Sequence, residues 1–452
     1  MDGIRTLMYG WEFPPRISGG LGVACYAIVR ELINQHINLT LVLPYTLATS
    51  DIEQLRLING GNSTASVNNA DPGGHLEIKY PAVSTSLHPY AKDITRRLSE
   101  ESVRDFLTLV SQLALPDEIK KLAKITMDEQ RLTLDDHYEN NLLTEVFRYA
   151  FFAGKLGMEV THDVIHAHDW LTVLAALEAK GRSGKPLILH IHALETDRSG
   201  FWVDRNIFAI EKYGMQYADR IIAVSQFTKD NIVRHYGIAP DKITVIHNGV
   251  YANDQQLVQK CGMQKSHRMV LFLGRITHQK GPYFFIEAAK KVLERRQDVQ
   301  FVLAGTGDSL ATMIERVAEL RMGKNVHFTG FLSPTKVQQI YGLADVYVMP
   351  SVSEPFGLSA LEALSSGIPA VISKQSVVAE VLNHILTADF WDTNDIAAKI
   401  LALLDYGALR DTTLFHSRSD INLLTWEKAA NKIINVYESA ILHHCEEREN
   451  YP

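Results

Sequence analysis

Short apolar segments alternate with amphipathic helical segments along most of the chain, and this alternation limits the fold more than any other feature. Residues 164–167 and 220–224 are typical apolar segments, and residues 282–295 form a typical helical one. Such alternation is the pattern of α/β domains, in which a strand, a crossover helix and the next strand form one unit. In the first half, strands are predicted at 6–9, 39–44, 164–167, 186–192, 220–224 and 243–247.

The same pattern starts again in the second half. A chain of 452 residues is too long for one ordinary core, so we predict two doubly wound, Rossmann-like sheets in series. Ligands of such sheets bind at the carboxyl ends of the strands. Strands are predicted at 269–273, 299–304, 326–329, 346–349 and 370–372, with helices at 282–295, 309–321, 334–343 and 358–365.

The predicted domain boundaries follow changes in this pattern. The first domain covers 1–250 and contains a charged, mainly helical insertion at about 88–157, whose function the sequence does not reveal. A polar stretch at 251–267 is the expected linker, and the second domain covers 268–424. A last helix within 425–452 is expected to pack back on the first domain.

Charge and cysteine content exclude several classes of protein. With 45 basic and 52 acidic residues, the formal net charge of -7 gives no general attraction to nucleic acid or anionic membranes. No run of 18 apolar residues is present, so no stable membrane association is expected. Cys25, Cys261 and Cys445 are too few and too scattered for a disulfide framework. The short apolar start is interrupted by Arg5 and does not resemble a signal peptide, so a cytoplasmic location is expected.

Two glutamates flank a predicted loop-to-helix junction. Glu354 and Glu362 have seven residues between them, and Gly357 allows the backbone to approach a ligand closely. The helix then begins near Leu358 and Ser359, where unpaired backbone N–H groups can hold a diphosphate. The alternative is that Glu354 is a solvated loop residue and that Glu362 is exposed on the helix.

Two cations follow the first strand of the second domain. Arg275 and Lys280 lie in GRITHQKG, which lacks the spacing of a Walker loop. Arginine can bind a diphosphate with two hydrogen bonds and lysine as a point charge, although both could instead be surface charges on a turn. Gly305 follows the next strand and is expected to turn past a nucleotide.

The first domain carries a glycine-rich turn and a histidine-rich pair of strands. Gly19, Gly20 and Gly22 precede the first helix, where backbone amides can approach a ligand. The strands end in HAHDW and HIH, at 166–170 and 190–192. Histidines two apart share a strand face and could chelate a metal, but no carboxylate or cysteine has the spacing to complete a site, so no metal is expected. His190 is predicted to be a core histidine, and Asp169 could be a helix N-cap.

The segment SEPFGLSALEALSSGIPAV, together with the GR…KG pattern, resembles the glycosyl transferase group 1 family. This family of retaining glycosyltransferases has the GT-B fold, in which two Rossmann-like domains face each other across a cleft. The resemblance covers nearly the whole chain and is densest from 270 to 382. YGWEFPPRISGGLGVACY and HAHDW are similar to the corresponding segments of bacterial glycogen synthase-like proteins.

The resemblance implies a role for each matching residue. Arg275 and Lys280 would bind the diphosphate of a nucleotide sugar, Glu362 its ribose and Glu354 its hexose. His192 would also meet the hexose, and Asp169 would lie near the donor sugar or the acceptor. The backbone around Gly330 would meet the base. Family members often have Gly-Val-x-Glu where this chain has SVVAE at 376–380, which puts one backbone contact in question.

These implications combine into one expected reaction. A hexose would pass from UDP-glucose or ADP-glucose to an α-glucan with retention of configuration, and no cofactor would be needed. Alternatives are an enzyme with a lipid-linked or other envelope acceptor, a nucleotide-sugar epimerase and a non-catalytic sugar-binding protein. The sequence leaves the base, the hexose, the acceptor and the oligomeric state open.

Overall fold

The computed structural model forms two compact units. Unit 1 consists of Met1–Ile246 with Ala429–Pro452, and unit 2 is His247–Lys428. The described residues are 3–14, 19–44, 57–60, 64–67, 76–79, 142–199, 202–251 and 267–450, with scattered helical positions between 107 and 124. Most of the expected insertion at 88–157 and of the expected linker at 251–267 therefore lies outside the described residues.

Unit 1 is built on a nine-stranded sheet with the order β3-β4-β5-β2-β1-β6-β7-β8-β9. All neighbours are parallel except β4, which is antiparallel to β3 and to β5. The strands are β1 (Arg5–Tyr9), β2 (Asn38–Val42), β3 (Leu57–Gly60), β4 (Thr64–Val67), β5 (Leu76–Lys79), β6 (Val164–His168), β7 (Leu187–Ile191), β8 (Arg220–Ala223) and β9 (Ile243–Val245). The six strands predicted here are confirmed, while β3, β4 and β5 were missed because their sequences are short and polar.

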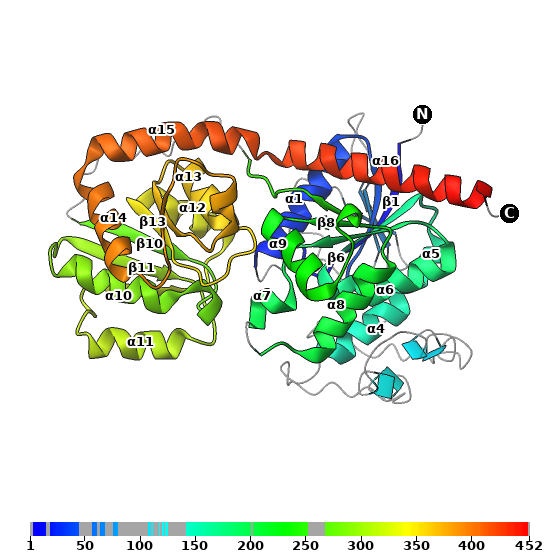
Figure 1. The fold of residues 1–452 in the computed structure, drawn as a ribbon, viewed down its shortest axis with the longest axis horizontal. Coiled ribbons are helices and arrows are strands. Elements are labelled where there is room, and N and C mark those ends of the chain that lie inside the picture. Colours follow the sequence, from blue (N-terminus) through cyan, green and yellow to red (C-terminus); the bar gives the residue numbers. More distant parts are fainter. Residues whose placement is uncertain are drawn as a thin grey trace. The chain divides into compact units, whose positions relative to one another are not determined.

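Helices cover both faces of this sheet. One face is apolar, because Ile165 and Ala167 of β6 join the core that the helices α4, α6 and α8 bury. The alternate residues of β6 point to the opposite face, where Tyr437 of α16 lies against His166. Figure 1 shows α16 on the other side of unit 1 from α4 and α8. The helices are α1 (Gly20–Asn34), α4 (Leu142–Gly154), α5 (Leu156–Glu159), α6 (Asp169–Ser183), α7 (Glu195–Ser199), α8 (Arg205–Tyr217), α9 (Gln226–Asn231) and α16 (Trp426–Asn450).

Unit 2 is built on six parallel strands in the order β12-β11-β10-β13-β14-β15. These are β10 (Arg268–Leu273), β11 (Val299–Ala304), β12 (Val326–Gly330), β13 (Val346–Met349), β14 (Ala370–Ser373) and β15 (Leu386–Ala388). The helices are α10 (Pro282–Leu293), α11 (Leu310–Glu319), α12 (Pro334–Leu343), α13 (Leu358–Ser365), α14 (Thr393–Asp405) and α15 (Gly407–Leu423). The five predicted strands are confirmed, and β15 escaped prediction because it has only three residues.

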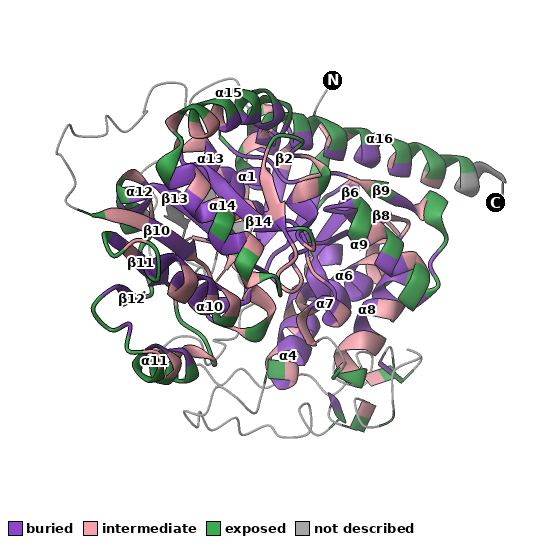
Figure 2. Ribbon diagram, turned by 60° about the vertical axis from the view of Figure 1, so that its left-hand side comes forward, coloured by how far each residue is buried: buried purple, intermediate pink, exposed green. Residues whose placement is uncertain are grey.

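Burial follows the layers of each unit. The strands and the inner helix faces are buried, whereas the outer faces of α15 and α16 are exposed (Figure 2). In unit 2, Ile286 of α10 and Ile400 of α14 pack with Val270 and Phe301 of the sheet. Within the described residues, no helix is long and apolar enough to cross a bilayer.

Each sheet has one position where the order of the strands reverses. In unit 2 the chain builds β11 and β12 on one side of β10, and then β13, β14 and β15 on the other. In unit 1 the reversal lies between β1 and β6. Loops that leave the carboxyl ends of strands at such a point diverge to opposite faces, so ligands of doubly wound sheets bind there.

Strand ends in unit 2 pack backbone against backbone. Gly305, directly after β11, has a φ of +139°, and a Cβ there would lie 1.9 Å from the carbonyl oxygen of Gly274. Its N–H donates to the carbonyl of Gly330, 3.0 Å away, at the end of β12. The three loops therefore meet closely only because position 305 has no side chain.

We predict that Gly305→Ala lowers the free energy of unfolding of unit 2 by about 3 kcal/mol, because it forces a clash and a backbone conformation that L-residues disfavour. Urea denaturation followed by circular dichroism measures the change. Gly323→Ala is the matched control, since a Cβ there would meet nothing within 4 Å. A control variant as unstable as Gly305→Ala would contradict the explanation.

Candidate functional site

The centre of the candidate site in unit 2 is an ion pair between two loops at the point of reversed strand order. The Nζ of Lys280, in the loop after β10, contacts the carboxylate of Glu354, in the loop after β13. The same loops are joined by the Val352 N–H, which donates to the carbonyl of Gln279 at 2.8 Å. Both charged residues were predicted from the sequence as site residues, but their pairing with each other was not.

Glu354 is held from several directions. Glu354 is only 5% exposed, so its interpretation as a solvated loop residue is wrong. The hydroxyl of Ser351 lies 3.5 Å from the carboxylate, and the backbone carbonyl of Glu354 accepts from the Val377 N–H at 3.0 Å. Val377 belongs to the segment that departs from the family pattern, and its backbone therefore supports the glutamate.

Glu362 faces inward from α13. Its carboxylate accepts from the Tyr341 hydroxyl at 3.1 Å, and burial raises the pKa of Glu362 above its ordinary value. The interpretation as an exposed helix residue is therefore wrong. The Ser359 hydroxyl accepts from the Tyr347 hydroxyl at 2.7 Å, so the first turn of α13 is tied to β13. These two tyrosines were missed, because apolar surroundings made them look like core residues.

The start of α13 opens at the same edge of the sheet. Gly357 precedes it with a φ of +94°, and a Cβ there would meet the side chains of Met349, Glu354 and Ser376. The first turn at Leu358 has no acidic residue and no side-chain cap. Its backbone N–H groups therefore remain suited to an anion.

Arg275 lies beside this edge, directly after β10. It is exposed, and it takes part in none of the ion pairs found between described residues. Its loop is bound to the one that contains Gly305, since the Ile276 N–H donates to the carbonyl of Thr306 at 2.8 Å. Arg275, Gly305 and Gly330 thus come from three neighbouring strand ends of one sheet.

In unit 1, Asp169 links the ends of β6 and β7. Its carboxylate accepts from the backbone N–H of His192 at 2.7 Å and lies 3.4 Å from that of Ala193. The N-cap of α6 is His168, so the interpretation of Asp169 as the N-cap is wrong. Asp169 has a φ of +54°, a conformation that costs energy for a non-glycine residue and that clusters at functional sites.

His192 is buried and forms a contact between ring nitrogens. Its Nε2 lies 3.0 Å from Nδ1 of His168. Burial lowers the pKa of His192, and the nearby Asp169 carboxylate partly opposes that change. His190 is a buried histidine of the core, as predicted, yet neither of its ring nitrogens has a hydrogen-bond partner among the described residues.

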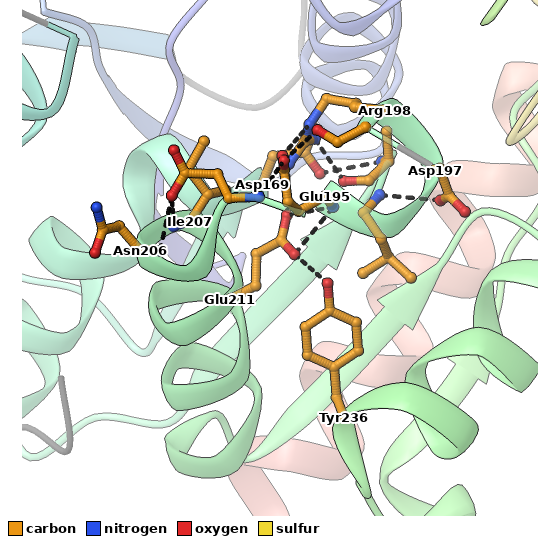
Figure 3. A network of polar contacts seen from close by, with 12 residues as sticks. Asp169, Glu195, Asp197, Arg198, Asn206, Ile207, Glu211 and Tyr236 are labelled. Atoms are coloured by element: carbon orange, nitrogen blue, oxygen red, sulfur yellow. Dashed lines mark hydrogen bonds and ion pairs between the residues drawn. The ribbon is translucent and has the colours of Figure 1, made fainter. Parts of the chain in front are cut away.

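A buried network of charges holds the segment after β7 (Figure 3). Arg198 forms ion pairs with Glu195 and Glu211, at 3.3 and 2.6 Å, and donates to the carbonyl of Ala193 at 2.9 Å. The Tyr236 hydroxyl donates to Glu211, and burial raises the pKa of Glu211 to about 7. The sequence signal that could have indicated this network is the charged run ETDR at 195–198, shortly after a strand.

The glycine-rich turn lies at the start of α1. The helix begins at Gly20 and contains Gly22, and Gly19 precedes it without a side-chain cap. A Cβ at Gly19 would meet nothing within 4 Å. Residues 15–18 lie outside the described residues, so the structure adds nothing on the loop itself.

We predict that Lys280→Met destabilises unit 2 by roughly 2–3 kcal/mol, because it leaves the buried Glu354 carboxylate without its cation. The double variant Lys280→Met/Glu354→Gln should regain most of that loss, since it removes the uncompensated charge. Urea denaturation of the wild type, both single variants and the double variant measures the coupling. Strict additivity of the two substitutions would show that the ion pair contributes nothing.

The raised pKa of Glu211 leads to a prediction on pH. Its ordinary value is 4.5 and its folded value about 7, so the folded protein binds this proton more tightly than the unfolded chain. The resulting stabilisation is complete below pH 4.5 and is lost as the pH rises to about 7. Between pH 5 and 8, the free energy of unfolding of the wild type should therefore fall by roughly 2–3 kcal/mol relative to that of Glu211→Gln.

Denaturation with urea at several pH values checks this expectation. Glu159→Gln is the control, because Glu159 is an exposed glutamate of the same unit. It should follow the wild type at every pH. A constant difference between the wild type and Glu211→Gln across this range would rule out a titrating Glu211.

Two family models match the chain in succession. Residues 253–413 match the glycosyl transferases group 1 model, and residues 128–253 match the glycosyltransferase family 4 model. The first match includes the whole candidate site of unit 2. The second includes β6, β7 and the charged network of unit 1.

Similar proteins extend over nearly the whole chain. An uncharacterized glycosyltransferase of Methanocaldococcus jannaschii is 27% identical, with 97% of this chain and 99% of that protein covered. A glycogen synthase of Mycobacterium tuberculosis is 26% identical, with 97% and 95% covered.

A solved structure, sucrose-phosphate synthase from Thermosynechococcus elongatus, is similar in fold. Its TM-score is 0.70 at 17% identity, with 97% of this chain and all of that chain covered. The predicted fold class, two Rossmann-like α/β domains of the GT-B type, is confirmed. The two matched family models both describe glycosyltransferases and together support the assignment of this chain as a glycosyltransferase, with residues 253–413 matching the group 1 model.

Proposed function

We propose that the chain is a retaining hexosyltransferase that moves glucose from UDP-glucose or ADP-glucose to an α-glucan. The observation that carries this proposal is the group formed by Lys280, Glu354 and the start of α13 at the reversal point of unit 2. It combines a cation, a buried carboxylate and free backbone N–H groups, as a diphosphate sugar requires.

In this proposal, the donor occupies the strand ends of unit 2. Arg275, Lys280 and the N–H groups at Leu358 and Ser359 bind the diphosphate. Glu362, aligned by Tyr341, accepts hydrogen bonds from the ribose hydroxyls. The backbones at Gly305 and Gly330 pass close to the nucleoside, where a side chain would occupy the space.

The chemistry depends mainly on charge in the leaving group. Negative charge develops on the diphosphate as the glycosidic bond breaks, and the cations stabilise it there. A diphosphate oxygen accepts the proton of the acceptor hydroxyl, and the acceptor oxygen forms its bond to the anomeric carbon on the face from which the diphosphate leaves, so the configuration there is retained. Glu354 binds the hexose hydroxyls, and diphosphate binding competes with it for Lys280.

Unit 1 is proposed to contribute the acceptor side and part of the hexose contact. His192 and Asp169 lie at the end of neighbouring parallel strands, beside the reversal point of their own sheet. The carboxylate of Asp169 fixes the backbone of His192, and the Arg198 network fixes the next residues. The similarity to a glycogen synthase along 97% of the chain favours a glucan as acceptor.

The test is an assay of nucleoside diphosphate release from each donor, with and without glycogen. We expect release that depends on glycogen and that strongly favours one donor. Release of nucleoside diphosphate that does not depend on glycogen would support a glycosyltransferase but reject a glucan as its acceptor. If neither donor binds and neither releases nucleoside diphosphate, the proposal is rejected.

Variants connect this activity to the site. We expect Lys280→Ala and Glu354→Gln each to lower kcat/KM by about 10²-fold or more, because Lys280 stabilises the charge that develops on the diphosphate and Glu354 positions the hexose. Lys324→Ala is the control, as Lys324 is an exposed lysine of the same unit. Full activity in Glu354→Gln would remove this carboxylate from the mechanism.

A further inference from the structure

Four histidines lie together on one face of the unit 1 sheet. β6 carries His166 and His168, β7 carries His190, and His192 follows β7 directly; His168 and His190 are paired in register. Residues two apart on a strand share a face. The ring centroids of His166 and His168 are 4.5 Å apart, and those of His190 and His192 are 4.3 Å apart. Four imidazole rings therefore share one small interior volume.

The pattern of satisfied and unsatisfied ring nitrogens is unusual. Nδ1 of His166 lies 2.6 Å from the Tyr437 hydroxyl, and Nδ1 of His168 lies 3.0 Å from Nε2 of His192. Within the described part of the chain, Nε2 of both histidines and both nitrogens of His190 lack any hydrogen-bond partner. The three residues are 0%, 0% and 1% exposed. Unpartnered polar atoms at such depth are costly and need an explanation.

Ring nitrogens of three of these histidines are close enough to share one ligand. One ring nitrogen from each of His166, His168 and His190 lies within 4.8 Å of the other two. Nitrogens that bind one tetrahedral zinc ion at ~2.1 Å are about 3.4 Å from each other. Small rotations of the rings would therefore bring all three nitrogens onto a single ion.

The second contacts of these rings match those of metal ligands. A histidine that binds a metal with one nitrogen usually holds a polar partner with the other, which fixes the ring and its tautomer. Tyr437 serves this purpose for His166, and His192 serves it for His168, which leaves Nε2 of each ring for an ion.

We propose that His166, His168 and His190 bind one divalent first-row transition-metal ion, with zinc as the first candidate. Imidazole nitrogens suit zinc, copper and nickel, and three of them leave one coordination position for water. The ion would join β6 to β7, hold α16 through Tyr437 and orient His192 through His168. No metal was expected from the sequence, because no carboxylate or cysteine has the spacing to complete a site; in this proposal the third ligand is a histidine of the neighbouring strand.

The first test is the metal content of the tag-free, full-length protein after dialysis against metal-free buffer. Inductively coupled plasma mass spectrometry should find about one first-row ion per chain. The variant His166→Gln/His190→Gln should lose it. His162→Gln is the matched control, because His162 is also buried but both its ring nitrogens have partners, the Val160 carbonyl and the Ser183 hydroxyl. It should keep the ion.

The second test uses the wild type alone and so does not depend on the folding of a variant. After treatment with a chelator, Co²⁺ should produce visible d–d absorption bands that saturate at about one equivalent, and Zn²⁺ should abolish them and raise Tm. Wild-type protein that holds no first-row ion and gives no Co²⁺ bands would overturn the proposal. Equal metal content in the double variant, or loss of the ion from His162→Gln, would overturn it as well. None of these outcomes depends on glycosyl transfer.

Discussion

Parallel pairing of strands is the constraint on which the rest of this structure depends. Since all neighbours in the unit 2 sheet run the same way, the loops after β10, β11, β12 and β13 leave one edge of the sheet. The order reverses between β10 and β13, so the loops of these two strands diverge beyond a shared edge. Lys280 and Glu354 lie in these two loops, and their ion pair joins segments that are 74 residues apart.

Both units use buried polar contacts to hold their strand ends. In unit 2, Tyr341 and Tyr347 bind the polar side chains of α13, and Glu354 is supported by Lys280, Ser351 and a backbone carbonyl contact. In unit 1, Asp169 and Arg198 form hydrogen bonds with the backbone just after β7. Buried polar groups cost free energy unless they are paired, so these networks make the loop positions specific. A site that must align charged groups with a ligand benefits from this preorganisation.

The two faces of the unit 1 sheet have different chemistry. One is filled by aliphatic residues against α4, α6 and α8, and the other carries the histidines against α16. α16 comes from the end of the chain and begins at Trp426, in unit 2, so the contact of Tyr437 with His166 joins residues 271 positions apart. The C-terminal helix is therefore part of the unit 1 core, and its tyrosine completes the surroundings of the histidine cluster.

The sequence by itself determined the class of fold, the two sheets and the charged residues of the site. Apolar periodicity is a local property, so strands such as β6 and β10 could be read directly, whereas β3, β4 and β5 have too weak a pattern. Motif spacing brought out Arg275, Lys280, Glu354 and Glu362. Only the tertiary structure decided which groups pair: Lys280 with Glu354, Tyr341 with Glu362, Asp169 with the backbone of His192, and His190 with the histidines of β6. Such partners lie far apart along the chain, and their contacts depend on strand order and register, which no local pattern encodes.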